Sequence, residues 1–243
     1  MALTRPTAWP IIVLMTVMLS SADARVFWRS GGRGEGSGAS EALGARIYET
    51  MVQINGGRGT LSVFSTDSGL AATLQRAAHL HGQSPPALVY RGDGMGIVVT
   101  AAAGRQVRLL VISPGEGNRC IVFRLEQTES DAAQSARTPE KHVLTDLPVY
   151  PGSIPLSFLR DEHQRTAIET SWASASDSAA ILSYFGSALK RDGWQPAQPD
   201  PAPATLATRL YGRGNDLCCV SVQPGERPGE FRITVLQKRS ALE

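Results

Sequence analysis

Hydrophobic residues recur along this chain with two different spacings. Apolar side chains three or four positions apart predict two amphipathic helices. One begins after Asp67 or Ser68 as N-cap candidates, and the other after Asp177 or Ser178. Each is followed by a glycine that suits a left-handed cap, Gly82 in the first and Gly193 in the second. Their apolar faces consist of Leu70, Leu74, Ala77 and Ala78, and of Ile181, Tyr184, Phe185, Ala188 and Leu189.

A further helix is expected over residues 40–54. Leu43, Ile47, Met51 and Ile54 fall on one side of such a helix, and Asn55-Gly56 provides a stop. The first half would then contain two helices.

Short apolar or alternating runs predict strands around both main helices. They cover residues 60–65, 88–90, 97–100, 107–112 and 120–125 in the first half, and 166–172, 210–211, 218–221 and 231–236 in the second. The sequence therefore predicts an α+β fold of two similar modules. Each module would be a strand, a helix and an antiparallel meander, with the helix on one face of the sheet.

Composition divides the 243 residues into segments. Residues 1–24 have the features of a signal peptide: Arg5, an apolar run too short to cross a bilayer, and a small-x-small site at Ala22 and Ala24. An uncleaved signal anchor is the alternative. Residues 25–39 are expected to be a glycine-rich tether, 40–127 and 142–243 the two modules, and 128–141 a linker.

The charge balance bears on partners. Twenty-four basic and 22 acidic residues leave a net charge of +2, too even for a dedicated nucleic-acid surface. A signal peptide and near-neutral charge together predict an exported protein, periplasmic or extracellular, whose partner is another envelope or secreted protein, with no transmembrane helix in the mature chain.

The second half carries Leu147-Pro148-Val149-Tyr150-Pro151-Gly152-Ser153, followed by Ser183-Tyr184-Phe185, Leu189 and Gly193-Trp194. Over residues 145–238 this resembles a module of bacterial exported proteins and lipoproteins, in which a "yPgs" segment precedes an "fY…L…GW" helix. The Tyr184-Phe185 order is reversed here, and no lipid-attachment cysteine is present. The resemblance implies architecture but no activity. Expected structural anchors are Tyr150, Pro151, Gly152, Tyr184, Phe185 and Trp194.

Candidate chemistry is sparse. The four histidines, His79, His81, His142 and His163, lack the spacing of a metal site, so no metal or cofactor is predicted. The glycine-rich stretch 92–96 lies between two predicted strands, which favours a hairpin turn over a phosphate loop.

Three cysteines are unusual in an exported chain. Cys218 and Cys219 are neighbours in a strand, so their side chains point to opposite faces and only one is expected in the core. Buried thiols are the simpler expectation. A disulfide between Cys120 and Cys218 or Cys219 is the alternative.

These observations favour a non-enzymatic binding or assembly module of the bacterial cell envelope. An exported hydrolase is the alternative if Asp93, His142, His163 or Asp216 converge in a cleft. A small-ligand sensor is a third hypothesis, in which Glu169, Ser171, Arg232 and Thr234 line one polar sheet face.

Overall fold

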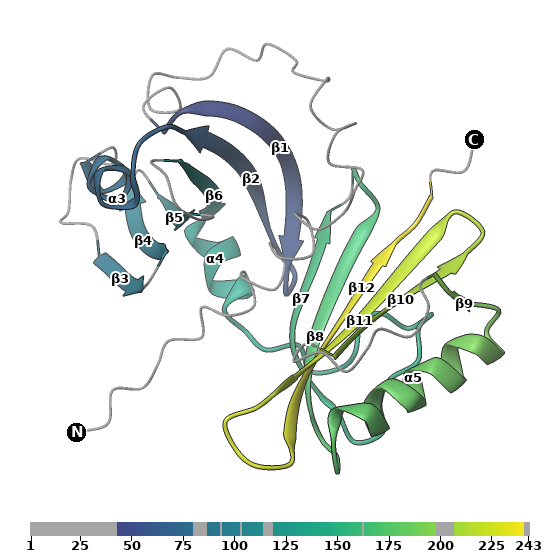
Figure 1. Cartoon of the computed structure of the whole chain (residues 1–243). Coiled ribbons are helices and arrows are strands. Elements are labelled where there is room, and N and C mark those ends of the chain that lie inside the picture. The colour runs from purple at the N-terminus through teal and green to yellow at the C-terminus, as the bar shows by residue number, and fades with distance from the viewer. Residues whose placement is uncertain are drawn as a thin grey trace. The chain divides into compact units, whose positions relative to one another are not determined.

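The computed structural model in Figure 1 describes the chain outside its first 42 residues and several short segments. The described residues are 43–79, 87–92, 94–102, 104–113, 119–161, 163–197 and 207–240. They form two compact units. Of the described residues, unit 1 contains those up to Val52 and from Gly56 to Gln134, and unit 2 contains Gln53–Asn55 and those from Ser135 onward.

Unit 1 is built on a twisted sheet with the strand order β3-β4-β5-β6-β2-β1. The pairs from β3 to β2 are antiparallel. α3 packs on β4 and β5, and the core beneath it includes Phe64, Leu74 and Leu109. The element bounds are β1 Ala45–Ile54, β2 Gly57–Thr66, α3 Leu70–His79, β3 Ala87–Gly92, β4 Met95–Ala102, β5 Arg105–Ile112 and β6 Cys120–Thr128.

The helix expected over residues 40–54 is wrong: this region contains strand β1. Tyr48, Thr50 and Val52 are more buried than their neighbours, which is the two-residue period of a strand. Asn55 and Gly56 have φ values of 47° and 94°. Positive φ at both central residues is characteristic of a type I′ hairpin turn. The Asn-Gly pair therefore marks a hairpin between β1 and β2.

The stretch between β3 and β4 is a hairpin turn, as predicted. Gly92 pairs with Met95, which leaves two residues for the turn, and Gly94 has a φ of 78°. After β6, the short helix α4 (Glu129–Ser135) forms within the segment expected to be a linker, and the division between the units falls at its last residue.

The strands of unit 2 are paired in the order β7-β8-β12-β11-β10-β9. All its pairs are antiparallel, and its last long strand, β12, lies beside β8, as β6 lies beside β2 in unit 1. The bounds are β7 Ile154–Asp161, β8 Thr166–Ser174, α5 Ser178–Arg191, β9 Gln195–Pro196, β10 Ala207–Arg213, β11 Asp216–Pro224 and β12 Glu230–Lys238.

The helix predicted after Asp177 is confirmed as α5. The Asp177 carboxylate accepts a 2.7 Å hydrogen bond from the Ala180 N–H and caps the N-terminus. At the other end Gly193 has a φ of 84°, and the Trp194 N–H donates to the Leu189 carbonyl at 3.0 Å. These bonds satisfy groups that a helix end leaves unpaired.

The expected α+β fold of two similar strand–helix–meander modules is wrong. Among the described residues there are twelve strands and three helices, so the chain is predominantly antiparallel β. Each unit also opens with two long adjacent strands where one was expected. The strand content was underestimated because the apolar spacing of β1 also fits a helix, and because an irregularity between Pro155 and Ser157 interrupts the alternation of β7.

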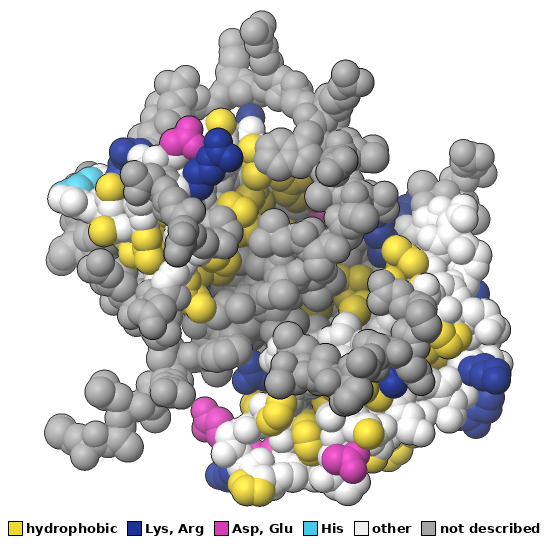
Figure 2. Space-filling model, in the orientation of Figure 1, with side chains coloured by type: hydrophobic (Ala, Val, Ile, Leu, Met, Phe, Trp, Pro, Cys, Tyr) yellow, Lys and Arg dark blue, Asp and Glu magenta, His cyan; other side chains and the backbone are white. Residues whose placement is uncertain are grey.

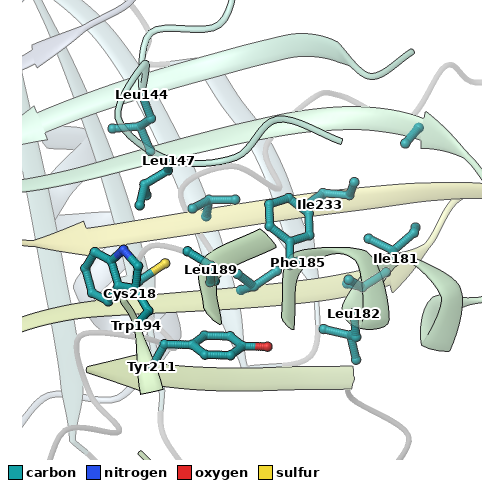
Figure 3. Packing of buried hydrophobic residues seen from close by; sticks show 14 of the residues in the cluster. Leu144, Leu147, Ile181, Leu182, Phe185, Leu189, Trp194, Tyr211, Cys218 and Ile233 are labelled. Carbon is teal, nitrogen blue, oxygen red and sulfur yellow. The ribbon is translucent and has the colours of Figure 1, made fainter. Parts of the chain in front are cut away.

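The core of unit 2 lies between α5 and its sheet (Figure 3). Phe185 and Leu189 point from the helix into this core, and Cys218 and Ile233 enter it from the strands. Leu144 and Leu147 enter the same core from the segment that precedes β7. This segment, residues 142–153, is therefore part of the folded unit.

Candidate functional site

The 142–153 segment ends in a tight turn at Tyr150-Pro151-Gly152-Ser153. The Ser153 N–H donates to the Tyr150 carbonyl at 3.1 Å, and Gly152 has a φ of 73°. Proline followed by a residue with positive φ is the pattern of a type II turn. Apart from the two adjacent residues, no atom of the described part of the chain lies within 4 Å of the place that a Gly152 Cβ would occupy, so the turn is open on that side.

Aromatic side chains attach the same segment to α5. The Tyr184 hydroxyl donates to the Val149 carbonyl at 2.7 Å. The Tyr150 and Tyr184 rings meet edge to face with centroids 5.2 Å apart, and Tyr184 meets Phe185 in the same way at 5.6 Å. Edge-to-face contact is a favoured arrangement of aromatic rings. The turn is thus fixed against the helix.

Glu169 attaches the start of the segment to the sheet. It lies on β8 opposite Val235, on the face that α5 covers, and only 6% of it is exposed. Its Oε2 accepts hydrogen bonds from the backbone N–H groups of Val143, at 2.6 Å, and Leu144, at 3.0 Å. Its Oε1 is bonded to His142 Nδ1. A buried carboxylate needs such partners to offset its lost hydration.

His142 links this carboxylate to the end of the turn. Its Nε2 lies 3.1 Å from the Ser153 carbonyl oxygen and 3.2 Å from Ser153 Oγ. The Ser153 hydroxyl donates its one hydrogen to the Tyr150 carbonyl oxygen at 2.7 Å, so its oxygen is free to accept from Nε2. Glu169, His142 and Ser153 therefore stand in the order carboxylate, imidazole, hydroxyl.

A small cavity lies beside these three residues, and hydrophobic side chains make up most of its wall. It is lined by His142, Leu144, Leu147, Pro148, Val149, Tyr150, Ser153, Glu169, Ser171, Phe185 and Val235. Its polar groups are thus gathered at the Glu169–His142–Ser153 arrangement and Ser171.

A second carboxylate in the segment, Asp146, binds the C-terminal end of the sheet. Its Oδ2 accepts a 2.8 Å hydrogen bond from Gln237 Nε2 and forms an ion pair with Arg239. Burial alone would raise the pKa of Asp146, but the bonds from Gln237 and Arg239 outweigh that effect and lower it.

Four residues were considered for a hydrolase, and the three of them that the structure describes do not converge in one cleft. His163 is exposed in the turn after β7, and Asp216 accepts a 2.8 Å hydrogen bond from the Ser240 N–H. Asp93 lies outside the described residues. Of the three described residues, His142 is the one that lines the cavity, and its partners are Glu169 and Ser153.

The residues considered for a polar sensor face lie on two different faces. Glu169 and Ser171 pair with Val235 and Ile233 on the side of α5, whereas Thr234 pairs with Thr170 on the other. Arg232 also lies on that other side, with its guanidinium 4.8 Å from the centre of the Trp172 ring, and burial lowers its pKa. All but Arg232 are buried. These four residues therefore do not line one polar sheet face.

The three cysteines are free and buried. Cys218 belongs to the core under α5, and Cys219 points to the opposite face of β11, where it is 9% exposed. Burial raises the pKa of Cys218 to about 12 and that of Cys219 to about 11. For Cys120, burial also raises the pKa.

The predicted anchors Phe185 and Trp194 are in the core, and Tyr150 and Tyr184 pack against it. The Arg213 guanidinium lies over the Trp194 ring, 4.6 Å from its centre.

Within the described ranges, no group of three potential ligands could hold a metal ion. The helices described there are all too short or too polar to cross a membrane. The signal site at Ala22 and Ala24, His81 and Gly82 lie outside the described residues, whereas His79 is exposed at the end of α3.

Sequence reasoning missed Ser153 and Asp146 as site residues, and it did not connect Glu169 to His142. Residues 142 and 169 are 27 positions apart, and only the packing of the 142–153 segment on β8 joins them. The one usable signal was the turn sequence Tyr150-Pro151-Gly152, which fixes where the following serine lies.

Comparisons with protein-family models, with curated proteins and with solved structures found no match. The resemblance of residues 145–238 to an exported module therefore remains a prediction.

Proposed function

We propose that this chain is an exported protein of the bacterial cell envelope that binds another protein through the surface of the 142–153 segment. The observation that carries this proposal is that the segment is held rigidly and yet presents apolar side chains to solvent. Val149 is 38% exposed, and Ile154, the first residue of β7, is 65% exposed. Isolated exposed apolar residues are common, but here two border one fixed turn.

Rigid attachment favours binding. The segment is held at three places along its length. Glu169 bonds to Val143, Gln237 and Arg239 bind Asp146, and Tyr184 bonds to Val149. A loop already ordered before binding loses less conformational entropy when a partner arrives. Binding residues on loops supported by a rigid sheet are a general arrangement in proteins.

The surface chemistry supports a protein partner. Figure 2 shows hydrophobic side chains reaching the surface of the described residues at several places, while acidic and basic groups are scattered. With a net charge of +2, no strong field favours a polyanion. The sequence of the first 24 residues supports export.

Site-specific photo-crosslinking in intact cells of the source bacterium would test this function. A photoreactive residue at position 154 should give a discrete crosslinked protein band, and one at the exposed Lys190 of α5 should not. Ile154→Asp combined with Val149→Asp should remove partner recovery while leaving the thermal unfolding midpoint within a few degrees. Absence of any band from positions 149 and 154, or equal bands from 190, would contradict the proposal. Amino-terminal sequencing of the exported protein tests the cleavage after Ala24.

A further inference from the structure

Three side chains from three neighbouring strands of unit 2 form one row. Trp172 on β8 stands directly opposite Ile154 on β7 and directly opposite Arg232 on β12. Directly opposed residues of antiparallel strands place their side chains on the same face. Ala173, the residue after Trp172, belongs to the core under α5, so the row lies on the face of these strands away from α5.

The row is accessible to solvent. Ile154 is 65% exposed, and Trp172 and Arg232 are both partly exposed. Two residues further along β8 and β12 on the same face, Thr170 and Thr234 are only 3% and 4% exposed. This end of the face therefore presents an aliphatic side chain, an indole ring and a guanidinium side by side.

Trp172 is held in place by its neighbours. The Arg232 guanidinium lies over its ring, and a cation is attracted to the face of an aromatic ring. The β11–β12 loop comes so close that a Cβ on Gly225 would lie 3.0 Å from Trp172 Cζ3. A side chain that is fixed before binding loses little conformational entropy in a complex. Trp and Arg are also enriched among the residues that dominate protein interfaces.

Arg232 gives this row a positive charge. Burial lowers the pKa of the guanidinium, and the negative charge of Glu226 in the β11–β12 loop offsets that effect only in part. The group still carries its charge at neutral pH. Its five N–H donors allow it to bind a carboxylate in addition to its contacts within the chain. A carboxylate from a partner would compensate for the hydration that this cation has lost.

We propose that the protein partner of this chain presents an acidic side chain next to an apolar one to this row. The carboxylate binds the Arg232 guanidinium, and the apolar side chain packs against Ile154 and Trp172. This inference rests on the proposed protein-binding function, since Ile154 belongs to both surfaces, and it adds the chemistry that the partner carries.

Photo-crosslinking from p-benzoylphenylalanine at position 154 in intact cells tests the charge. Arg232→Met keeps a long apolar side chain beside Trp172 but removes the cation, and it should lower the yield of the crosslinked protein band by about fivefold or more. Arg227→Met makes the same change at an exposed position of the β11–β12 loop. This control should leave the yield within about twofold of the unaltered chain.

Gln223→Glu changes the charge without altering the row itself. Gln223 stands directly opposite Arg232 on β11, so a glutamate there can pair with the guanidinium within the chain. An opposite-charge pair across two strands stabilises a sheet, so this variant should fold. It should nevertheless lower the band by about fivefold or more, because the partner's carboxylate then meets a neutralised cation.

The outcomes separate this inference from the binding function. A band of unchanged yield in both Arg232→Met and Gln223→Glu would show that binding at Ile154 needs no carboxylate, and the binding function would stand without the acidic partner. Loss of the band in only one of the two variants would also overturn the acidic partner, because both remove the same available charge. If the chain unaltered at positions 223 and 232 gives no band from 149 or 154, the binding function fails and this inference fails with it.

Discussion

Glu169 Oε2 accepts a 2.6 Å hydrogen bond from the backbone N–H of Val143, a residue 26 positions earlier in the chain. This bond joins the 142–153 segment to the middle of the unit 2 sheet. Glu169 is 6% exposed, so water cannot replace a lost partner.

Replacing Glu169 by alanine should therefore destabilise unit 2 strongly. The N–H groups of Val143 and Leu144 would lose their acceptor, and His142 would lose its carboxylate. Removing one partner of a buried charged network costs about 3 kcal/mol. Urea unfolding followed by tryptophan fluorescence measures this loss. Glu140→Ala, at an exposed position, is the matched control, and an equal effect of both changes would refute the prediction.

Stability should decrease in acid partly because of Asp146. The pKa of this carboxyl is lower in the folded chain than the ordinary value of 3.8, since the bonds from Gln237 and Arg239 outweigh its burial. A lowered folded-state pKa gives stability that is fully present above the unfolded pKa and is lost as the pH falls through the folded one. Asp146→Asn should weaken the pH dependence of the urea midpoint below about pH 4. An unchanged pH dependence would show that Asp146 does not contribute.

The thiols of unit 2 should be slow to react. With pKa values of about 12 for Cys218 and about 11 for Cys219, both remain protonated at neutral pH, and the thiolate is the reactive form. Iodoacetamide at pH 8 should label these thiols only after denaturant is added. Rapid labelling of Cys218 in the folded chain would contradict its burial. Mass spectrometry without reductant also tests the alternative disulfide with Cys120.

Two glycines of unit 2 should respond in opposite directions to alanine. Gly152 has a φ of 73° but no close neighbour, so Gly152→Ala should cost about 1 kcal/mol from backbone conformation alone. Gly186 lies inside α5, where its added Cβ would lie 3.4 Å from the Tyr211 hydroxyl. Gly186→Ala should be neutral or stabilising by up to about 1 kcal/mol. Thermal unfolding of the two variants compares them directly, and a reversed order would exclude the assigned turn.

The sequence determined the features that depend on near neighbours. Asp177 and Gly193 marked the ends of α5, and the apolar spacing of Ile181, Phe185 and Leu189 placed its inward face correctly. The alternating directions of Cys218 and Cys219 followed from strand geometry alone. The ends of the helix, its inward face and the opposite directions of two adjacent strand residues all depend on the conformation of neighbouring residues alone.

Tertiary structure decided what depends on distant contacts. Ile47 and Met51 fit a helical spacing, but the burial of Tyr48, Thr50 and Val52 and the Asn55-Gly56 turn show a strand. The predominance of β structure was likewise missed, because β1 has apolar residues at helical spacing and the alternation of β7 is interrupted between Pro155 and Ser157. Nor could spacing connect Glu169, His142 and Ser153, since these residues meet only when the 142–153 segment packs against β8.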